Sequence, residues 1–207
     1  MFNSSAKKLT CSLVNNKVIL EEDYEIYRFG IEMGLSMIAS ILTTLLIGIV
    51  FHMLMESILF LFAFIPLRSY VGGFHASDYR KCYWLSTFAV AILLFTVRFV
   101  IQIYSVFYIL CIGSVCVLIM LFLVPVQDPN RPLEEVEIRI YKKRAKIVLG
   151  IESVVMLTLS LIGQEIAASV LFCTLCLMCI TSCMGVIKNQ IMQKQRKCLF
   201  TRYTEKV

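Results

Sequence analysis

Residues 33–67 read MGLSMIASILTTLLIGIVFHMLMESILFLFAFIPL, an apolar stretch interrupted only by His52 and Glu56. As one helix, these 35 residues would be about 52 Å long, whereas the hydrocarbon core of a bilayer is about 30 Å thick. The stretch therefore predicts two membrane-spanning helices joined by a turn near Val50–Glu56. The second helix is short, at about 14–16 residues, and is expected to end at Pro66.

The rest of the chain has the same character. Of its 207 residues, 59% are hydrophobic and only 16% are charged, and the mean hydropathy is +0.81. Soluble domains have about 45–50% apolar and about a quarter charged residues, so this composition excludes a soluble globule. We predict an all-α polytopic integral membrane protein with about six transmembrane helices, forming a single membrane-embedded domain over residues 1–207. The four further spans are expected near residues 83–97, 103–124, 147–163 and 166–187.

The Lys and Arg residues orient this bundle, because cytoplasmic loops carry the excess of positive charge. With the N-terminus inside, nineteen of the twenty Lys and Arg residues fall on the cytoplasmic side, and only Arg98 falls outside. Both termini are therefore expected in the cytoplasm. This topology accounts for the net charge of +6 and leaves nucleic-acid binding without support. The predicted cytoplasmic segments are a leader (1–29), a loop (67–82), a basic loop (127–146) and a tail (188–207).

The nine cysteines do not indicate a disulfide framework or a metal site. Four of them, in the stretch 173–183, lie on one predicted helix about 15 Å long, along which a tetrahedral zinc site cannot gather its ligands. We interpret the cysteines inside apolar runs as packing residues. They are Cys111, Cys116, Cys173, Cys176, Cys179 and Cys183. No nucleotide or cofactor motif accompanies them.

The predicted loop that ends at Cys82 contains the candidate catalytic residues. It holds His75, one of only two histidines, and Cys82 stands at a span boundary beside cations. A helix N-terminus, neighbouring Lys or Arg and a His partner all favour the nucleophilic thiolate. On an unbroken helix the two residues would lie about 10.5 Å apart along the axis, too far for proton transfer. We therefore predict that the loop folds back and that a helix starts near Tyr79, capped by Ser77 or Asp78.

Other residues of the loop have more than one interpretation. Asp78 either orients the imidazole of His75 or serves only as the helix cap. Gly72 and Gly73 either aim amide N–H groups at a developing oxyanion or form a simple tight turn. Arg68 either binds a peptide carboxylate, braces the loop on an acidic residue such as Glu32 or Glu152, or anchors the topology.

A second polar segment follows the fourth predicted span. Its acidic start and its cations Lys142, Lys143, Arg144 and Lys146 are typical of a helix with a basic end. The cations either dock an acidic peptide or lie against anionic lipid. In the next span, Glu152 is an ionisable residue at membrane depth, and we expect it to pair with Arg68 or Lys146.

The pattern R-x-x-x-G-G-x-H-A over residues 68–76, followed by Cys82 at the start of the next apolar span, resembles the signature of the accessory gene regulator B (AgrB) family. These are membrane cysteine endopeptidases of bacterial peptide quorum sensing. The resemblance implies that His75 and Cys82 are the catalytic pair and that Arg68 and Gly73 are important for activity. The Lys-rich loop of the family corresponds to 142–144, where the third position is Arg.

The resemblance also implies a reaction and a partner. The substrate is a small AgrD-like pro-peptide with an amphipathic leader, a central autoinducer segment containing Cys or Ser, and an acidic tail. The Cys82 thiolate attacks the junction before the tail, and the precursor's own side chain then displaces the acyl-enzyme to close a thiolactone or lactone ring. This exchange needs no metal or other cofactor.

The expected location is the bacterial cell membrane, with the active site on the cytoplasmic face. The predicted partners are the pro-peptide and the lipid bilayer, and a homodimer stays open. The rival hypothesis is a non-enzymatic six-span protein that exports or scaffolds a peptide and does not require His75 and Cys82.

Overall fold

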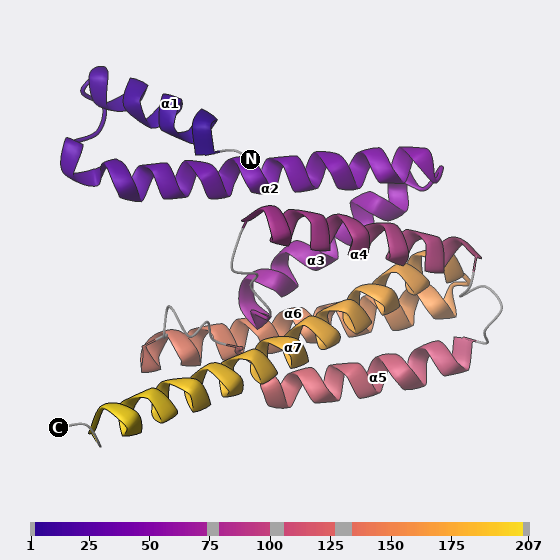
Figure 1. Cartoon of the computed structure of the whole chain (residues 1–207). Helices are drawn as coiled ribbons and strands as arrows, with labels where there is room; N and C mark the ends of the chain where they lie inside the picture. The colour runs from indigo at the N-terminus through magenta and orange to yellow at the C-terminus, as the bar shows by residue number, and fades with distance from the viewer. Residues whose placement is uncertain (1–2, 74–78, 100–105, 127–133, 205–207) are drawn as a thin grey trace. The chain divides into compact units, whose positions relative to one another are not determined.

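The computed structural model describes residues 3–73, 79–99, 106–126 and 134–204, which are helical almost throughout (Figure 1). The described residues contain no β-strand, only an isolated bridge between Gly72 and Val126. The predicted all-α fold is therefore confirmed. The elements are α1 (Asn3–Asn15), the short 3-10 helix η1 (Glu21–Asp23), α2 (Tyr24–Val50), α3 (Leu54–Val71), α4 (Tyr79–Phe99), α5 (Val106–Leu123), α6 (Glu135–Leu161) and α7 (Glu165–Thr204).

Each predicted span has a helix, and within the described part of the chain four helical segments are long and apolar enough to cross a membrane. These segments are Glu21–Val50, Leu54–Val71, Lys81–Phe99 and Glu165–Met192. α5 contributes a shorter apolar helix, Phe107–Leu123. α6 is charged in its first half and apolar in its second. The chain is an all-α polytopic membrane protein.

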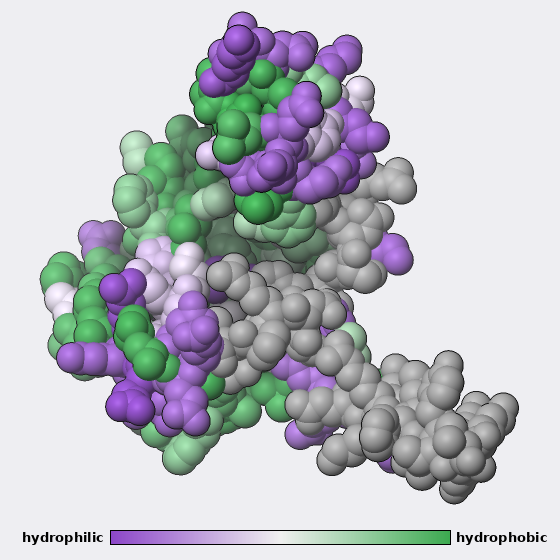
Figure 2. All heavy atoms as spheres, turned by 90° about the vertical axis from the view of Figure 1, so that its left-hand side faces the viewer, coloured by the Kyte–Doolittle hydropathy of each residue, from purple (hydrophilic) through white to green (hydrophobic). Residues whose placement is uncertain are grey.

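Large hydrophobic side chains lie open on the surface. Val50, Phe62, Phe122 and Leu161 are each at least 76% exposed. Figure 2 shows such side chains spread over the visible surface instead of being confined to an interior. Soluble monomers rarely expose large contiguous apolar patches, so this surface fits the contact of the spanning helices with lipid.

The turn predicted within 50–56 is confirmed. α2 ends at Val50, and α3 begins at Leu54. Between them His52 has a φ of 55°, a left-handed conformation that His adopts more readily than most residues. His52 is thus a residue of the turn.

α3 does not end at Pro66, as the sequence predicted, but continues to Val71. A proline inside a helix removes one backbone hydrogen bond and crowds the preceding turn. Leu67 and Val71, however, are both fully buried in the core, and this packing keeps the last turn helical. Arg68 consequently lies in the last turn of α3 and not in a loop.

Two other helices are longer than the predicted spans 147–163 and 166–187, and α6 includes the helix that the acidic start and basic end of the preceding segment predicted. α6 is continuous from Glu135, and its start is capped because the N–H of Glu134 donates to Oε2 of Glu137 at 3.1 Å. Ala145 is fully buried, so the basic segment already belongs to a packed helix. α7 continues to Thr204, since no glycine or proline follows Gly185.

The chain forms two compact units. The first consists of Met1–Leu54 and Ala76–Ile92. Within it α1 lies along α2 (Figure 1), with Ala6 and Thr10 of α1 fully buried. The predicted leader therefore contains a packed helix, and α2 begins inside it.

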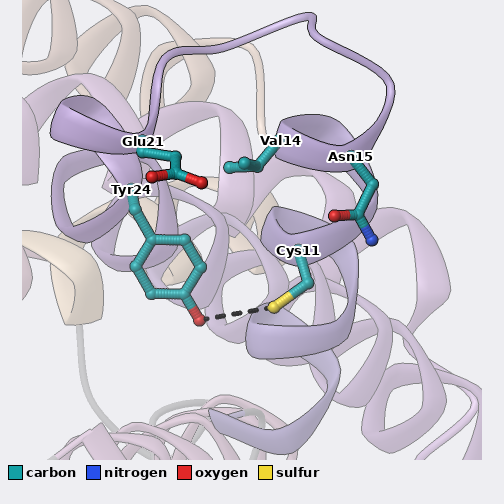
Figure 3. A pocket seen from close by; sticks show the side chains of 5 residues that line it. All are labelled: Cys11, Val14, Asn15, Glu21 and Tyr24. Carbon is teal, nitrogen blue, oxygen red and sulfur yellow. Dashed lines mark hydrogen bonds between the residues drawn. The ribbon is translucent and has the colours of Figure 1, made fainter.

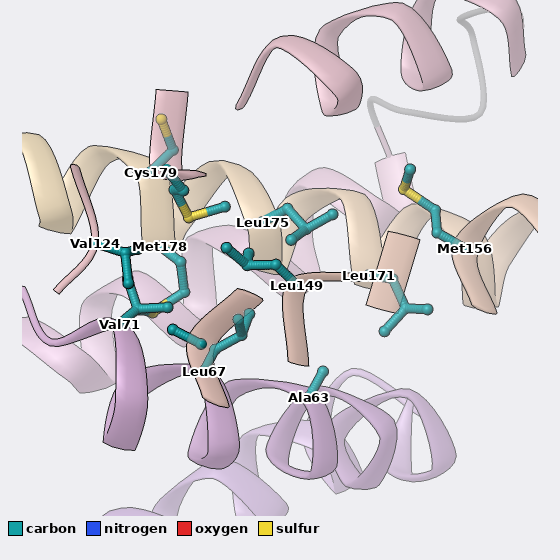
Figure 4. Packing of buried hydrophobic residues seen from close by; sticks show 12 residues of the cluster. Ala63, Leu67, Val71, Val124, Leu149, Met156, Leu171, Leu175, Met178 and Cys179 are labelled. Atoms are coloured by element: carbon teal, nitrogen blue, oxygen red, sulfur yellow. The ribbon is translucent and has the colours of Figure 1, made fainter. Parts of the chain in front are cut away.

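The second unit consists of Met55–His75 and Leu93–Val207, and it holds the hydrophobic core. α3, α5, α6 and α7 all contribute side chains that interdigitate there (Figure 4). The buried cluster comprises Ala63, Leu67, Val71, Met120, Val124, Ala145, Leu149, Met156, Leu171, Leu175, Met178 and Cys179. This core fixes the end of α3 relative to α6 and α7.

The cysteines of the apolar runs lie on α5 and α7. The series from Cys173 to Cys183 follows one continuous helix, as predicted. Cys179 is buried, and the Sγ atoms of Cys116 and Cys176 are 3.8 Å apart. Cys111 differs from the prediction because it is exposed on α5 instead of packed.

Candidate active site

The paired glycines of the motif form a turn directly after α3. Gly72 and Gly73 have φ values of 79° and 130°, which residues with a Cβ rarely adopt. The N–H of Val126 donates to the carbonyl of Val71 at 2.9 Å, and Gly72 pairs with Val126 as an isolated bridge. The glycine turn is thereby hydrogen-bonded to the segment that follows α5.

Arg68 braces this turn. Its Nη1 donates to the carbonyl oxygen of Gly72 at 3.1 Å. A cation in the last turn of a helix is well placed to satisfy a carbonyl there. A Cβ on Gly73 would collide with the same Nη1, so the absence of a side chain at position 73 is what lets Arg68 lie across the turn.

One acceptor of Arg68, the carbonyl of Gly72, was not expected from the sequence. The bond to a backbone carbonyl, four residues ahead, is a brace that needs no acidic side chain. Glu152 is buried on α6, and its Oε2 has no hydrogen-bond partner among the described residues. The expected pairing with Arg68 or Lys146 is therefore not seen at that atom.

Gly72→Ala is expected to destabilise the protein by about 2 kcal/mol or more. A left-handed φ costs an L-residue about 1–2 kcal/mol, and the new Cβ would collide with the backbone carbonyl oxygen of Val126. Thermal unfolding in detergent micelles measures the loss. The matched control is Gly150→Ala in α6, where a Cβ meets nothing within 4 Å. A Gly72→Ala protein as stable as this control would contradict the structure of the turn.

The basic segment of α6 lies beside the last turn of α3. The Cζ atom of Arg144 is 5.6 Å from the centroid of the Tyr70 ring. The rings of Tyr70 and Tyr141 meet edge to face at 6.1 Å. Lys142 and Lys143 are exposed. Two polar motifs that are about seventy residues apart in sequence are thus joined through an aromatic pair.

Sequence reasoning did not single out Tyr70 or Tyr141. Tyr70 lies within the 68–76 motif and Tyr141 directly precedes Lys142, and this proximity is the signal that could have found them. No spacing rule relates residues on helices that meet only in the tertiary fold.

In the first unit, Cys82 is the fourth residue of α4, which the structure describes from Tyr79 on. Its side chain is half-buried. The next residue, Tyr83, shares a hydrogen bond of 2.7 Å with Oγ1 of Thr43 on α2, so this turn of α4 is tied to α2. The first N–H groups of a helix lack intrahelical partners, and they create a positive potential around the first turn.

The remaining predicted residues of the motif, His75 and Asp78, lie outside the described residues. The fold-back that would bring His75 to Cys82, and the capping role of Ser77 or Asp78, therefore stay predictions.

A hollow of about 300 Å³ lies elsewhere in the first unit, among α1, η1 and α2 (Figure 3). Its lining includes Cys11, whose Sγ is 3.8 Å from the hydroxyl of Tyr24, and Glu21. It contains none of the predicted site residues.

These observations define the class: an all-α polytopic membrane protein with a braced glycine turn, a basic helical segment and a cysteine in the first turn of a spanning helix. The chain matches the family model described as Accessory gene regulator B over residues 6–188, and it belongs to that family. The resemblance noted in the sequence is thereby confirmed, and the family is one of peptide processing in quorum sensing.

One curated relative is AgrB-like protein 2 of Clostridium perfringens (strain 13 / Type A). The two are 33% identical over 75 residues, which is 34% of this chain and 35% of that protein. The chain thus spans about a third of the length of the curated relative that it matches. No solved structure matches the chain.

Proposed function

We propose that this protein is a membrane-embedded cysteine endopeptidase that removes the C-terminal tail of an AgrD-like pro-peptide and promotes ring closure of the autoinducing peptide. The observation that carries the proposal is the position of Cys82 in the first turn of α4, in a chain that belongs to the AgrB family. The first backbone N–H groups of a helix and the adjacent Lys81 would both support a thiolate at this position.

His75 is the proposed general base. It takes the proton of the Cys82 thiol, which requires an imidazole nitrogen within about 3 Å of Sγ or one bridging water. The chain reaches His75 only two residues after the glycine turn. Since Arg68 and Val126 brace that turn, we infer that their role is to start the 74–78 segment from a defined place.

The reaction proceeds in two exchanges. The thiolate of Cys82 adds to the carbonyl at the autoinducer–tail junction, the C–N bond breaks, and the tail leaves with a proton on its new amine. A thioester between the peptide and Cys82 remains. The precursor's own cysteine then attacks this thioester, closes the thiolactone and returns the thiolate to Cys82.

The second exchange replaces one thioester by another and is close to neutral in free energy. Water competes with the precursor's thiol for the acyl-enzyme, so limited access of water favours cyclisation. A nucleophile at the end of a membrane-spanning helix suits this need. An oxyanion role for the amide groups of Gly72 and Gly73 stays a prediction.

The exposed cations of α6 fit the substrate side of the proposal. Lys142 and Lys143 carry positive charge into solvent beside the last turn of α3, where they would attract an acidic tail by charge complementarity. We place the motif, the basic segment and both termini on the cytoplasmic side, because the Lys and Arg distribution favours that topology.

The experiment that tests this function is co-expression with an AgrD-like precursor, followed by quantification of the released tail. Dependence of release on Cys82 and His75 supports the endopeptidase. Release without them would favour a peptide exporter or scaffold.

A further inference from the structure

The three neighbouring cations Lys142, Lys143 and Arg144 are not equivalent. Arg144 lies with its guanidinium over the ring of Tyr70, at 5.6 Å from Cζ to the centroid. Among the described residues, no such ring contact is seen for Lys142 or Lys143. Arg144 therefore has a defined place, whereas the two lysines project into solvent on flexible stems.

The ring also has a defined place. Tyr70 is held edge to face by Tyr141, one helical turn before Arg144 on α6. It precedes Val71, whose carbonyl accepts the N–H of Val126. Arg144, which contacts the ring of Tyr70, is thus positioned by contacts next to those that hold the glycine turn in place.

A guanidinium on an aromatic face keeps its chemistry for another ligand. Where a guanidinium stacks on an aromatic ring, it does so through its planar face, which leaves the N–H bonds along its edge available to other acceptors. A carboxylate can accept two of them in parallel, an arrangement that a lysine ammonium cannot offer. Because the ring already restricts Arg144, less rotamer freedom is lost when the carboxylate binds.

We propose that Arg144, held on Tyr70, is a preorganised binding site for one carboxylate of the substrate's acidic tail. This inference rests on the proposed function and makes one residue of the basic segment its specificity determinant.

The test measures binding without cleavage. Full-length Cys82→Ala protein in lipid nanodiscs is titrated with a short fluorescein-labelled peptide rich in glutamate, and with the same peptide carrying glutamine at each of those positions. Arg144→Lys keeps the positive charge but loses the planar guanidinium. Lys143→Gln removes a positive charge from the same segment but keeps the guanidinium of Arg144, so it is the matched control.

For the acidic peptide we expect Arg144→Lys to weaken binding about five- to tenfold and Lys143→Gln only about two- to threefold. Tyr70→Leu should behave like Arg144→Lys, whereas Tyr70→Phe, which keeps the ring, should retain most of the affinity. The glutamine peptide should bind weakly to every variant and not distinguish them.

Two results would overturn the inference. One is an Arg144→Lys protein that binds the acidic peptide as tightly as the parent. The other is a Lys143→Gln protein that loses as much affinity as Arg144→Lys, since that would mean diffuse electrostatic attraction. Thermal unfolding identifies any misfolded Tyr70→Leu protein, and the exposed Arg144 keeps the test decisive in that case.

The binding assay also separates this inference from the proposed function. If tail release does not depend on Cys82 but the binding pattern holds, the endopeptidase proposal fails and the carboxylate site stands. If release depends on Cys82 but the variants bind alike, only the carboxylate site fails.

Discussion

Replacing Cys82 by alanine is expected to abolish release of the tail from a co-expressed AgrD-like precursor, with a loss of at least about a thousandfold. The thiolate is the proposed nucleophile, and no other group can form the acyl-enzyme in its place. Quantitative mass spectrometry of the tail peptide measures the effect. Cys111→Ala is the matched control, because Cys111 is exposed on the apolar α5.

The control should process the precursor at the parental rate. If Cys82→Ala released the tail as fast as Cys111→Ala, the protein would not be a cysteine endopeptidase. The non-enzymatic exporter or scaffold would then be the better hypothesis.

The second large effect is expected for His75→Asn, which should slow tail release by about 10²–10⁴-fold. Without a positioned base, the thiol has to lose its proton to solvent. A rate assay of the purified protein, with a synthetic precursor, measures the effect.

His52→Asn is the control for this variant. His52 lies in the turn between α2 and α3 at a left-handed φ of 55°, which asparagine also tolerates. We expect parental activity. A His75→Asn protein with the rate of the control would remove His75 from the mechanism.

Apolar runs and their lengths predicted most of the fold. The 35-residue stretch at 33–67 is too long for one span, so the turn at 51–53 followed from bilayer thickness alone. The prediction of a helix start near Tyr79 came from chemistry, since His75 and Cys82 cannot meet on one unbroken helix. Each argument compares a stretch of local sequence with a known length: the thickness of the bilayer in the first, and the axial distance between two residues on a helix in the second.

The misplaced boundaries have a common cause in tertiary packing. Pro66 indicates the end of a helix, but the burial of Leu67 and Val71 outweighs its local cost. The charges around Lys142 place the start of the fifth span at about residue 147, but α6 is continuous from Glu135 and Ala145 is buried on it. Local signals do not contain this packing, because the partner residues come from distant parts of the chain.

In the candidate site, too, local sequence features were predicted and tertiary contacts were not. The motif from Arg68 to Cys82 was readable as a pattern, and its helix start was predicted. The brace from Arg68 to the carbonyl of Gly72 was not, because a backbone acceptor leaves no mark in the sequence. The contact of Tyr70 with Arg144 depends on how α3 meets α6, which only the structure provides.

The most direct test of the central claim is a search for the acyl-enzyme on Cys82. A precursor whose ring-closing cysteine is changed to alanine can still be cut but cannot displace the thioester. After an acid quench and proteolysis, we predict that the Cys82 peptide carries a mass increment equal to the leader–autoinducer segment minus one water. Full release of the tail with no adduct on Cys82 would contradict the account.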